Sequence, residues 1–170
     1  MKVHKKEQYE YSDSKRIEKF KFDYGVEISQ EQQVIDLSDT RWFSSQFSSR
    51  YILKDISRIE LDKCEKLILP LLCKGIEEFK PKMKNLKFLD MSSCEIKSLK
   101  LDPVYFPSLE SLYLIDNKIK VCNDIKIISE FPSLKYVYLH KNPIVKSNKE
   151  LFKLFDLLKN NNKNINVYIV

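Results

Sequence analysis

One apolar spacing recurs along the sequence and limits what this chain can fold into. In an eleven-residue unit, leucine or another apolar residue occupies the first, fourth, sixth and eleventh positions, and asparagine or a small residue occupies the ninth. Three consecutive units, which begin at Leu86, Leu109 and Leu134, fit this spacing, and looser units surround Ile35 and Ile59. Recurrence at a period of about 20 to 50 residues indicates a stack of structural repeats.

The same spacing predicts one short strand in each unit. Two inward apolar residues that flank one outward residue follow the period of a strand, and parallel stacking buries the apolar sets of neighbouring units against each other. The markers of the six predicted strands are Ile35, Ile59, Leu89, Leu112, Val137 and Val167. We therefore predict an α/β fold, a right-handed solenoid arc with about six parallel strands on its concave face and helices or irregular segments on its convex face.

The chain divides into three predicted parts. Residues 1–31 are expected to form an N-terminal arm and a capping strand, because apolar residues alternate strictly from Phe20 to Ile28. Residues 32–145 hold the repeats. Residues 146–170 are expected to form a capping helix and the last strand, because Ser147 and Glu150 fit a capping box before an apolar run. A basic amphipathic membrane helix is the alternative for this run.

Between the strands, apolar spacing predicts two further helices. One extends from Leu67 to Phe79 and ends before Pro81, and a shorter one begins at Asn123 or Asp124 and ends at Glu130. Both would lie on the convex side.

The ninth position of each unit turns the chain away from its strand, so its side chain must satisfy backbone groups there. Asn117 and Asn142 supply amide donors and acceptors, whereas Cys64 and Cys94 are smaller substitutes that we expect to stack in one ladder. A disulfide or a metal ion between these two cysteines is the alternative. The sequence has no C-x-x-C pair, and we interpret its four cysteines as reduced thiols of an intracellular protein.

Composition excludes several classes of function. Two glycines form no phosphate-binding motif, and two histidines leave little for a metal site or a catalytic triad. We therefore predict no enzymatic activity, no cofactor and no metal; an enzyme that relies on His140 is the least favoured alternative. No apolar run has the length of a membrane span, and no targeting segment is evident. The expected location is cytoplasmic or mitochondrial, and the protein is not expected to be secreted.

Residues between the inward leucines define a candidate binding surface on the concave face. Its N-terminal half is expected to be acidic and its C-terminal half aromatic. The predicted partner-binding residues are Asp36, Glu60, Asp62, Phe88, Asp90, Tyr113, Ile115, Tyr136, Tyr138, His140 and Tyr168. Aromatic side chains dominate interface energies and carboxylates steer basic partners, so we predict a protein partner with a basic or mixed basic and apolar segment. Tyrosines that only stabilise the sheet are the alternative.

A lysine run provides a second candidate surface. The net charge is +6, and Lys80, Lys82, Lys84 and Lys87 are the predicted anion-binding residues. Phosphate or anionic lipid would suit them, and a solvated loop is the alternative. Nucleic acid is a less favoured partner, because carboxylates on the concave face would repel phosphate.

The three regular units resemble those of intracellular leucine-rich repeat proteins, and Leu-His-Lys-Asn-Pro-Ile at 139–144 is similar to the final unit of many of them. This resemblance covers residues 32–170 and implies a curved solenoid that binds proteins, as an accessory or structural subunit of a larger complex. A spliceosomal member binds an RNA–protein pair, which implies a ribonucleoprotein role as one alternative.

A narrower resemblance is to coupling factor B-like proteins of the mitochondrial ATP synthase and respiratory complexes. Residues 34–40, residues 59–64 and the ending from Leu134 to Val170 are similar in order and character. This resemblance implies an accessory subunit of an energy-converting complex as the other alternative.

Overall fold

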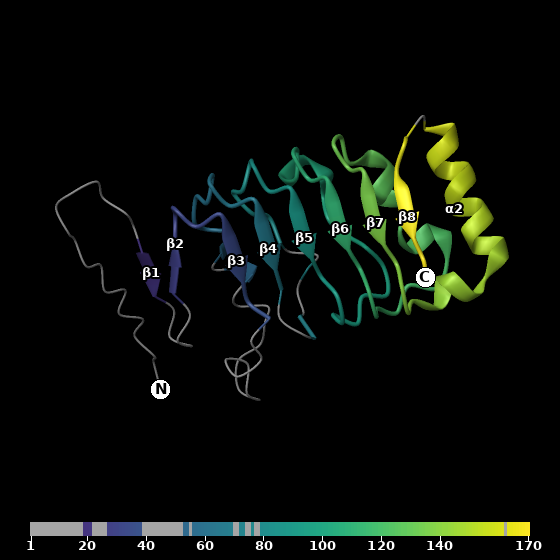
Figure 1. Cartoon of the computed structure of the whole chain (residues 1–170), viewed down its shortest axis with the longest axis horizontal. Helices are drawn as coiled ribbons and strands as arrows, with labels where there is room; N and C mark the ends of the chain where they lie inside the picture. Colours follow the sequence, from purple (N-terminus) through teal and green to yellow (C-terminus); the bar gives the residue numbers. More distant parts are fainter. Residues whose placement is uncertain are drawn as a thin grey trace.

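A six-stranded, all-parallel sheet dominates the computed structural model of the chain, which describes residues 19–21, 27–38, 53–54, 56–69, 72–73, 76, 79–161 and 163–170. Its strands are β3 (Val34–Asp36), β4 (Lys66–Ile68), β5 (Phe88–Asp90), β6 (Ser111–Tyr113), β7 (Tyr136–Tyr138) and β8 (Asn166–Tyr168). They lie side by side in chain order (Figure 1). The predicted α/β class and the six parallel strands are confirmed.

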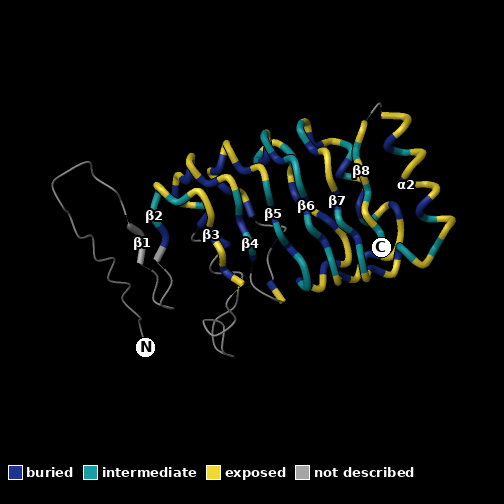
Figure 2. Tube along the Cα trace, in the orientation of Figure 1, coloured by how far each residue is buried: buried dark blue, intermediate teal, exposed yellow. Residues whose placement is uncertain are grey.

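The sheet forms because β3 to β7 each bury their central residue and direct the flanking two outward, while the central residue of β8 is partly buried. Leu67, Leu89, Leu112 and Val137 are in register and have no exposed surface. The alternation of buried and less buried positions is visible along the strands in Figure 2. Stacking these aliphatic side chains removes apolar surface from water, which is the main driving force for the arrangement.

The second strand lies eight residues later than predicted. The sequence places it at Ile59, but β4 is Lys66–Ile68, and Glu60 forms only an isolated bridge with Lys82. Ile59 and Leu61 are buried as well, so both apolar pairs reach the core. The helix predicted to start at Leu67 is also wrong, because β4 occupies its first two residues.

The N-terminal strand prediction is wrong in form. Instead of one strand from Phe20 to Ile28, β1 (Lys19–Lys21) and β2 (Glu27–Ser29) pair antiparallel in a separate two-stranded sheet. Ile28 is buried and belongs to the same core as Ile35, and β2 lies on the β3 side of the main sheet (Figure 1). The predicted arm at residues 1–18 lies outside the described residues, and the capping role of residues 1–31 stays a prediction.

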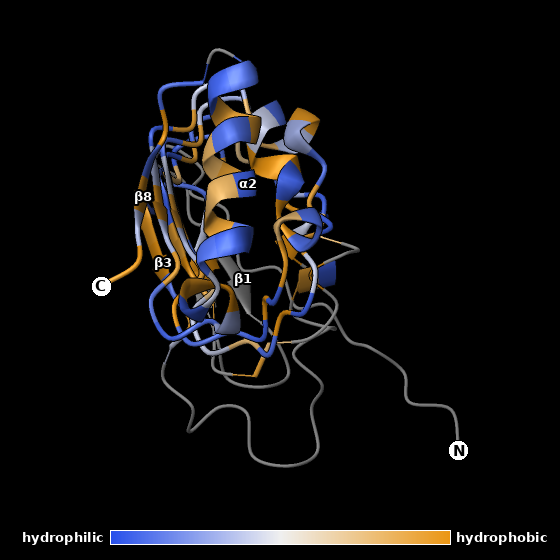
Figure 3. Ribbon diagram, turned by 90° about the vertical axis from the view of Figure 1, so that its right-hand side faces the viewer, coloured by the Kyte–Doolittle hydropathy of each residue, from blue (hydrophilic) through white to orange (hydrophobic). Residues whose placement is uncertain are grey.

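Short helical turns and one longer helix cover one face of the sheet (Figure 3). They are η3 (Pro103–Tyr105), η4 (Cys122–Asp124), η5 (Lys126–Glu130), η6 (Pro143–Lys146) and α2 (Asn148–Asn160). The predicted helix from Asn123 or Asp124 to Glu130 is thus two 3-10 turns. Between the layers, the Phe79, Phe106 and Phe131 rings follow one another at 6.0 and 6.1 Å between centroids.

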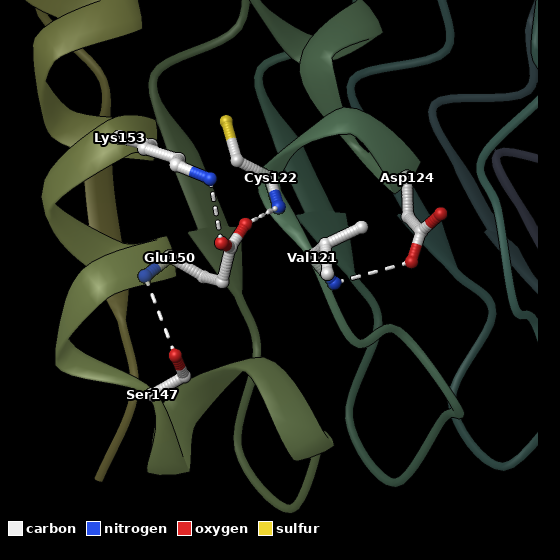
Figure 4. A network of polar contacts seen from close by, with 6 residues as sticks. All are labelled: Val121, Cys122, Asp124, Ser147, Glu150 and Lys153. Carbon is white, nitrogen blue, oxygen red and sulfur yellow. Dashed lines mark hydrogen bonds and ion pairs between the residues drawn. The ribbon is translucent and has the colours of Figure 1, made fainter.

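The predicted helix is present, but only the Ser147 half of its predicted capping box forms, because the Glu150 carboxylate binds a neighbouring turn instead. The Ser147 hydroxyl accepts from the Glu150 N–H at 3.4 Å and caps α2. The Glu150 carboxylate accepts from the Cys122 N–H of η4 at 2.9 Å and from Lys153 Nζ at 2.8 Å (Figure 4). The ion pair with Lys153 and the Cys122 hydrogen bond lower the pKa of Glu150. These contacts tie the start of α2 to the turn before it.

Leu151, Leu154 and Leu158 anchor α2 in the core, where they are at most 7% exposed. This packing favours the capping interpretation over a membrane helix. Among the described residues, no helix is long and apolar enough to cross a membrane.

Candidate functional site

The candidate site is the open face of the sheet, opposite the layer of turns (Figure 3). Strand register aligns its side chains in two columns. The first column is Val34, Lys66, Phe88, Ser111, Tyr136 and Asn166; the second is Asp36, Ile68, Asp90, Tyr113, Tyr138 and Tyr168. Apart from the β4 residues, both columns are those predicted from the sequence.

An aromatic ladder, defined as Phe88, Tyr113, Tyr138 and Tyr168, crosses the C-terminal part of the open face. Ring centroids are 4.5 Å apart between Phe88 and Tyr113, 4.0 Å between Tyr113 and Tyr138, and 4.6 Å between Tyr138 and Tyr168. The two tyrosine pairs are stacked, with interplanar angles of 18° and 9°. These distances are close to the roughly 4.8 Å between neighbouring strands, so the sheet itself sets the stacking.

Charged and polar groups border the ladder. Lys66 Nζ lies 4.5 Å from the Phe88 ring centroid in a cation–π contact. The His140 ring lies 6.3 Å from Tyr138, and its Nε2 hydrogen-bonds the carbonyl oxygen of Val170. Tyr136 lies beside Tyr168, with 6.5 Å between centroids. Tyr136 and Tyr168 are 36% and 41% exposed, so this end of the open face offers apolar surface to a partner.

The place of Tyr113 in the ladder raises the pKa of its phenol. Burial, a hydrogen bond with the Tyr138 side chain and the nearby negative charge of Asp90 raise the pKa of Tyr113 to about 12. A phenol that stays neutral keeps its O–H donor at every physiological pH.

This raised pKa predicts a loss of stability in strong alkali. An unfolded tyrosine ionises near pH 10, so the Tyr113 contribution is fully present below that pH and is lost as pH rises towards about 12. Tyr113→Phe should reduce this alkaline fall, measured by denaturant unfolding across that pH range. Tyr105→Phe, in the opposite layer, is the matched control. Identical alkaline profiles for wild type and Tyr113→Phe would contradict the assignment.

The acidic half of the predicted surface is largely absent from the open face. Because β4 begins at Lys66, the predicted placement of Glu60 and Asp62 on the second strand is wrong: both lie outside the strands and pair with lysines. Asp36 and Asp90 do lie on the open face. Each also accepts a hydrogen bond from the backbone two residues later, at 2.9 and 2.8 Å, and so stabilises the turn after its strand.

The remaining predicted residues are gathered around the ladder. Phe88, Tyr113, Tyr136, Tyr138, His140 and Tyr168 are joined by ring contacts. Ile115 follows β6 by two residues and is partly buried. Their role in partner binding stays a prediction. Sequence analysis missed Lys66 and Ile68, although the 22-residue spacing from Leu67 to Leu89 matches the regular units and could have identified them.

The predicted anion-binding lysines are locally neutralised. Lys82, Lys84 and Lys87 lie 3.9, 3.8 and 3.1 Å from carboxylates of the preceding unit, and Lys80 lies over the Tyr105 ring. The acidic partners of the three ion pairs are Glu60, Asp62 and Glu65. A further pair joins Lys135 to Glu110 at 3.1 Å. This arrangement favours the alternative of a solvated, ion-paired surface for the lysine run.

The prediction that Cys64 and Cys94 stack on each other is wrong. A hydrogen bond from the Leu72 N–H to the Ser93 carbonyl, 2.8 Å long, places Cys73 rather than Cys64 beside Cys94. Hydrogen bonding with Cys73 lowers the pKa of Cys94, whereas burial raises the pKa of Cys64 to about 11. All four cysteines are buried. Within the described ranges, no group of three or more potential ligands is arranged to hold a metal ion.

Comparisons with protein-family models and with curated proteins find no match to this chain. The site therefore has to be interpreted from its own chemistry.

Proposed function

We propose that this chain is a non-enzymatic protein–protein interaction module, built as a leucine-rich repeat solenoid and serving as an accessory subunit of a larger complex. The recurring sequence unit and the one-strand-per-unit parallel sheet support the solenoid. The aromatic ladder on the open face is the observation that carries the binding role.

The geometry of the ladder favours a protein over a nucleic acid on this face. Nucleobases bind aromatic residues by stacking on ring faces. Here Tyr113 and Tyr138 each have rings on both sides at 4.0 to 4.6 Å, so these two residues offer only ring edges and hydroxyl groups. Edges and hydroxyls suit the aliphatic side chains and backbone carbonyls of a polypeptide.

The charges on the open face favour a mixed segment as its ligand. With Glu60 and Asp62 elsewhere, the residues of β3 to β8 include two carboxylates on the open face, Asp36 and Asp90, and one cation, Lys66. A partner segment with a few basic residues beside an apolar side chain would match both halves of the open face, the part with carboxylates and the part with aromatic rings. The anchor would lie beside Tyr136 and Tyr168, where apolar surface is exposed.

The test removes this exposed anchor site. Tyr136→Ala combined with Tyr168→Ala should weaken capture of the protein partners at least 30-fold, since a central aromatic anchor contributes about 2 kcal/mol or more. The measurement is affinity capture with the tagged full chain from its native cells, with isotope-labelled quantification, followed by titration of the recovered partner. Circular dichroism would verify folding.

Val104→Ala is the matched control, because Val104 is 72% exposed on η3, in the layer opposite the open face. Equal recovery by wild type and the double tyrosine variant would contradict the proposal. Recovery of energy-complex subunits, or of an RNA–protein pair, would choose between the two alternatives for the complex.

A further inference from the structure

Unpaired positive charge is concentrated along the edge where the strands end. We call this the basic edge, defined by Lys97, Lys118, Lys120, Lys141, Lys146 and Lys149, all of which are exposed. The segments that carry them, 95–97, 116–120 and 141–149, contain only Glu95 and Asp116 as acidic residues. Within the described part of the chain, none of the six lysines forms an ion pair.

Backbone hydrogen bonds place these segments side by side. The Lys118 N–H donates to the Ile96 carbonyl at 2.8 Å, and the Ile144 N–H donates to the Ile119 carbonyl at 2.9 Å. Ile96, Ile119 and Ile144 are all buried. Because neighbours of an inward residue in extended backbone point outward, Lys97, Lys118 and Lys120 project from the same edge.

The opposite edge, where the strands begin, differs sharply in its electrostatics. There Lys82, Lys84, Lys87 and Lys135 are each within 4 Å of a carboxylate. Both edges are rich in lysine, so lysine content does not distinguish them. They differ in whether those lysines form ion pairs with carboxylates. The unpaired lysines give the basic edge a field that attracts anions over about a Debye length.

Exposed apolar side chains accompany the basic edge. Val121, directly after Lys120, is 40% exposed, and Phe152, one helical turn after Lys149, is 69% exposed. Phe155, on the following turn of α2, is 43% exposed. Lysines beside exposed aromatic and aliphatic groups are the composition of a peripheral membrane-binding surface, where headgroup attraction and shallow insertion act together.

We propose that the basic edge docks on an anionic bilayer, with its lysines on the lipid headgroups and Val121 and Phe152 at the headgroup–acyl boundary. This surface is separate from the open face, so a docked chain can still present the aromatic ladder to a protein. Nucleic acid fits less well, because the exposed rings of this region, Phe152 and Phe155, both lie on α2, and the lysine-bearing segments 95–97, 116–120 and 141–149 contain no ring that could stack on successive bases.

Vesicle co-sedimentation of the full chain tests this proposal. The probes are phosphatidylcholine vesicles with and without phosphatidylserine, and a single-stranded oligonucleotide serves as the competing polyanion. We expect binding only to the anionic vesicles, falling steeply as salt is raised. Combined Lys118→Gln, Lys120→Gln and Lys146→Gln should weaken it about 100-fold, at about fivefold for each lysine. Phe152→Ser should weaken it about tenfold at constant charge.

A matched triple variant separates local docking from net charge. Lys82→Gln, Lys84→Gln and Lys87→Gln remove the same charge from ion-paired positions and should change binding less than threefold. Equal loss in both triple variants, absence of binding to anionic vesicles, or tighter binding to the oligonucleotide would each overturn the proposal. The Tyr136 and Tyr168 double variant should bind vesicles normally, so failure here is distinguishable from failure of the protein-binding role.

Discussion

Asn117→Ala is expected to lower the free energy of unfolding by about 4 kcal/mol. The Asn117 side chain is 2% exposed, and its Oδ1 accepts from the Cys94 N–H at 3.1 Å and the Ile96 N–H at 2.9 Å. Its Nδ2 donates to the Met91 carbonyl at 2.9 Å. Alanine would leave these three buried backbone groups without a partner, and each such group costs about 1 to 3 kcal/mol. Equilibrium denaturant unfolding measures the loss.

Alanine variants of two other asparagines should lower the free energy of unfolding by smaller amounts. Asn142 occupies the same position one unit later, where its Oδ1 accepts from the Ile119 N–H and its Nδ2 donates to the Leu114 and Leu139 carbonyls. The Leu139 carbonyl also accepts from the Asn142 N–H, so the variant would leave only two backbone groups without a partner. Asn142→Ala should therefore cost less, about 3 kcal/mol. Asn148 is exposed at the start of α2, and Asn148→Ala should change stability by less than about 1 kcal/mol. A loss for Asn117→Ala no larger than that for Asn148→Ala would contradict the bridging role.

The regular units made much of the sheet predictable. In the three regular units, at Leu89, Leu112 and Val137, the predicted strand and the observed strand coincide. Strand period and turn chemistry specify the same register there. The aromatic ladder follows from that register, because Tyr113, Tyr138 and Tyr168 are the outward residues of consecutive strands.

The second strand could not be placed by the same reasoning, because the sequence contains two suitable apolar pairs. Ile59 with Leu61 and Leu67 with Leu69 are all buried, so burial does not distinguish them. The choice depends on pairing between units: the Leu69 N–H donates to the Asp90 carbonyl at 2.9 Å, which continues the β5 ladder. Because the second strand lies at Lys66–Ile68 and not at Ile59, Glu60 and Asp62 are not on the open face. For the same reason Cys73, and not Cys64, lies beside Cys94.

Charge pairing was equally hidden from the sequence. The ion pairs along the edge where strands begin join residues 22 to 25 positions apart, such as Lys87 with Glu65 and Lys135 with Glu110. Only the stacking of one unit on the next brings such residues together. A run of lysines in the sequence therefore indicated an anion site where the structure has balanced pairs, and the scattered lysines of the basic edge attracted no prediction as a group.

Phe106→Ala is expected to destabilise the fold by about 4 kcal/mol, the usual range for a buried aromatic residue in a core being about 3 to 5 kcal/mol. Phe106 has no exposed surface, and its ring lies between those of Phe79 and Phe131, at 6.0 and 6.1 Å between centroids. Deleting it removes the centre of this row and leaves a cavity between the sheet and the turns. Chemical unfolding and thermal melting would both register the change.

A conservative variant and a surface variant show whether the loss of stability comes from deleting the ring or from any substitution in this segment. Phe106→Leu keeps most of the volume and should cost about 1 to 2 kcal/mol. Val104→Ala, two residues earlier and 72% exposed, should cost less than about 0.5 kcal/mol. A small loss for Phe106→Ala would mean that the turns can collapse onto the sheet without the ring, and the row of phenylalanines would then not be what holds the two layers together.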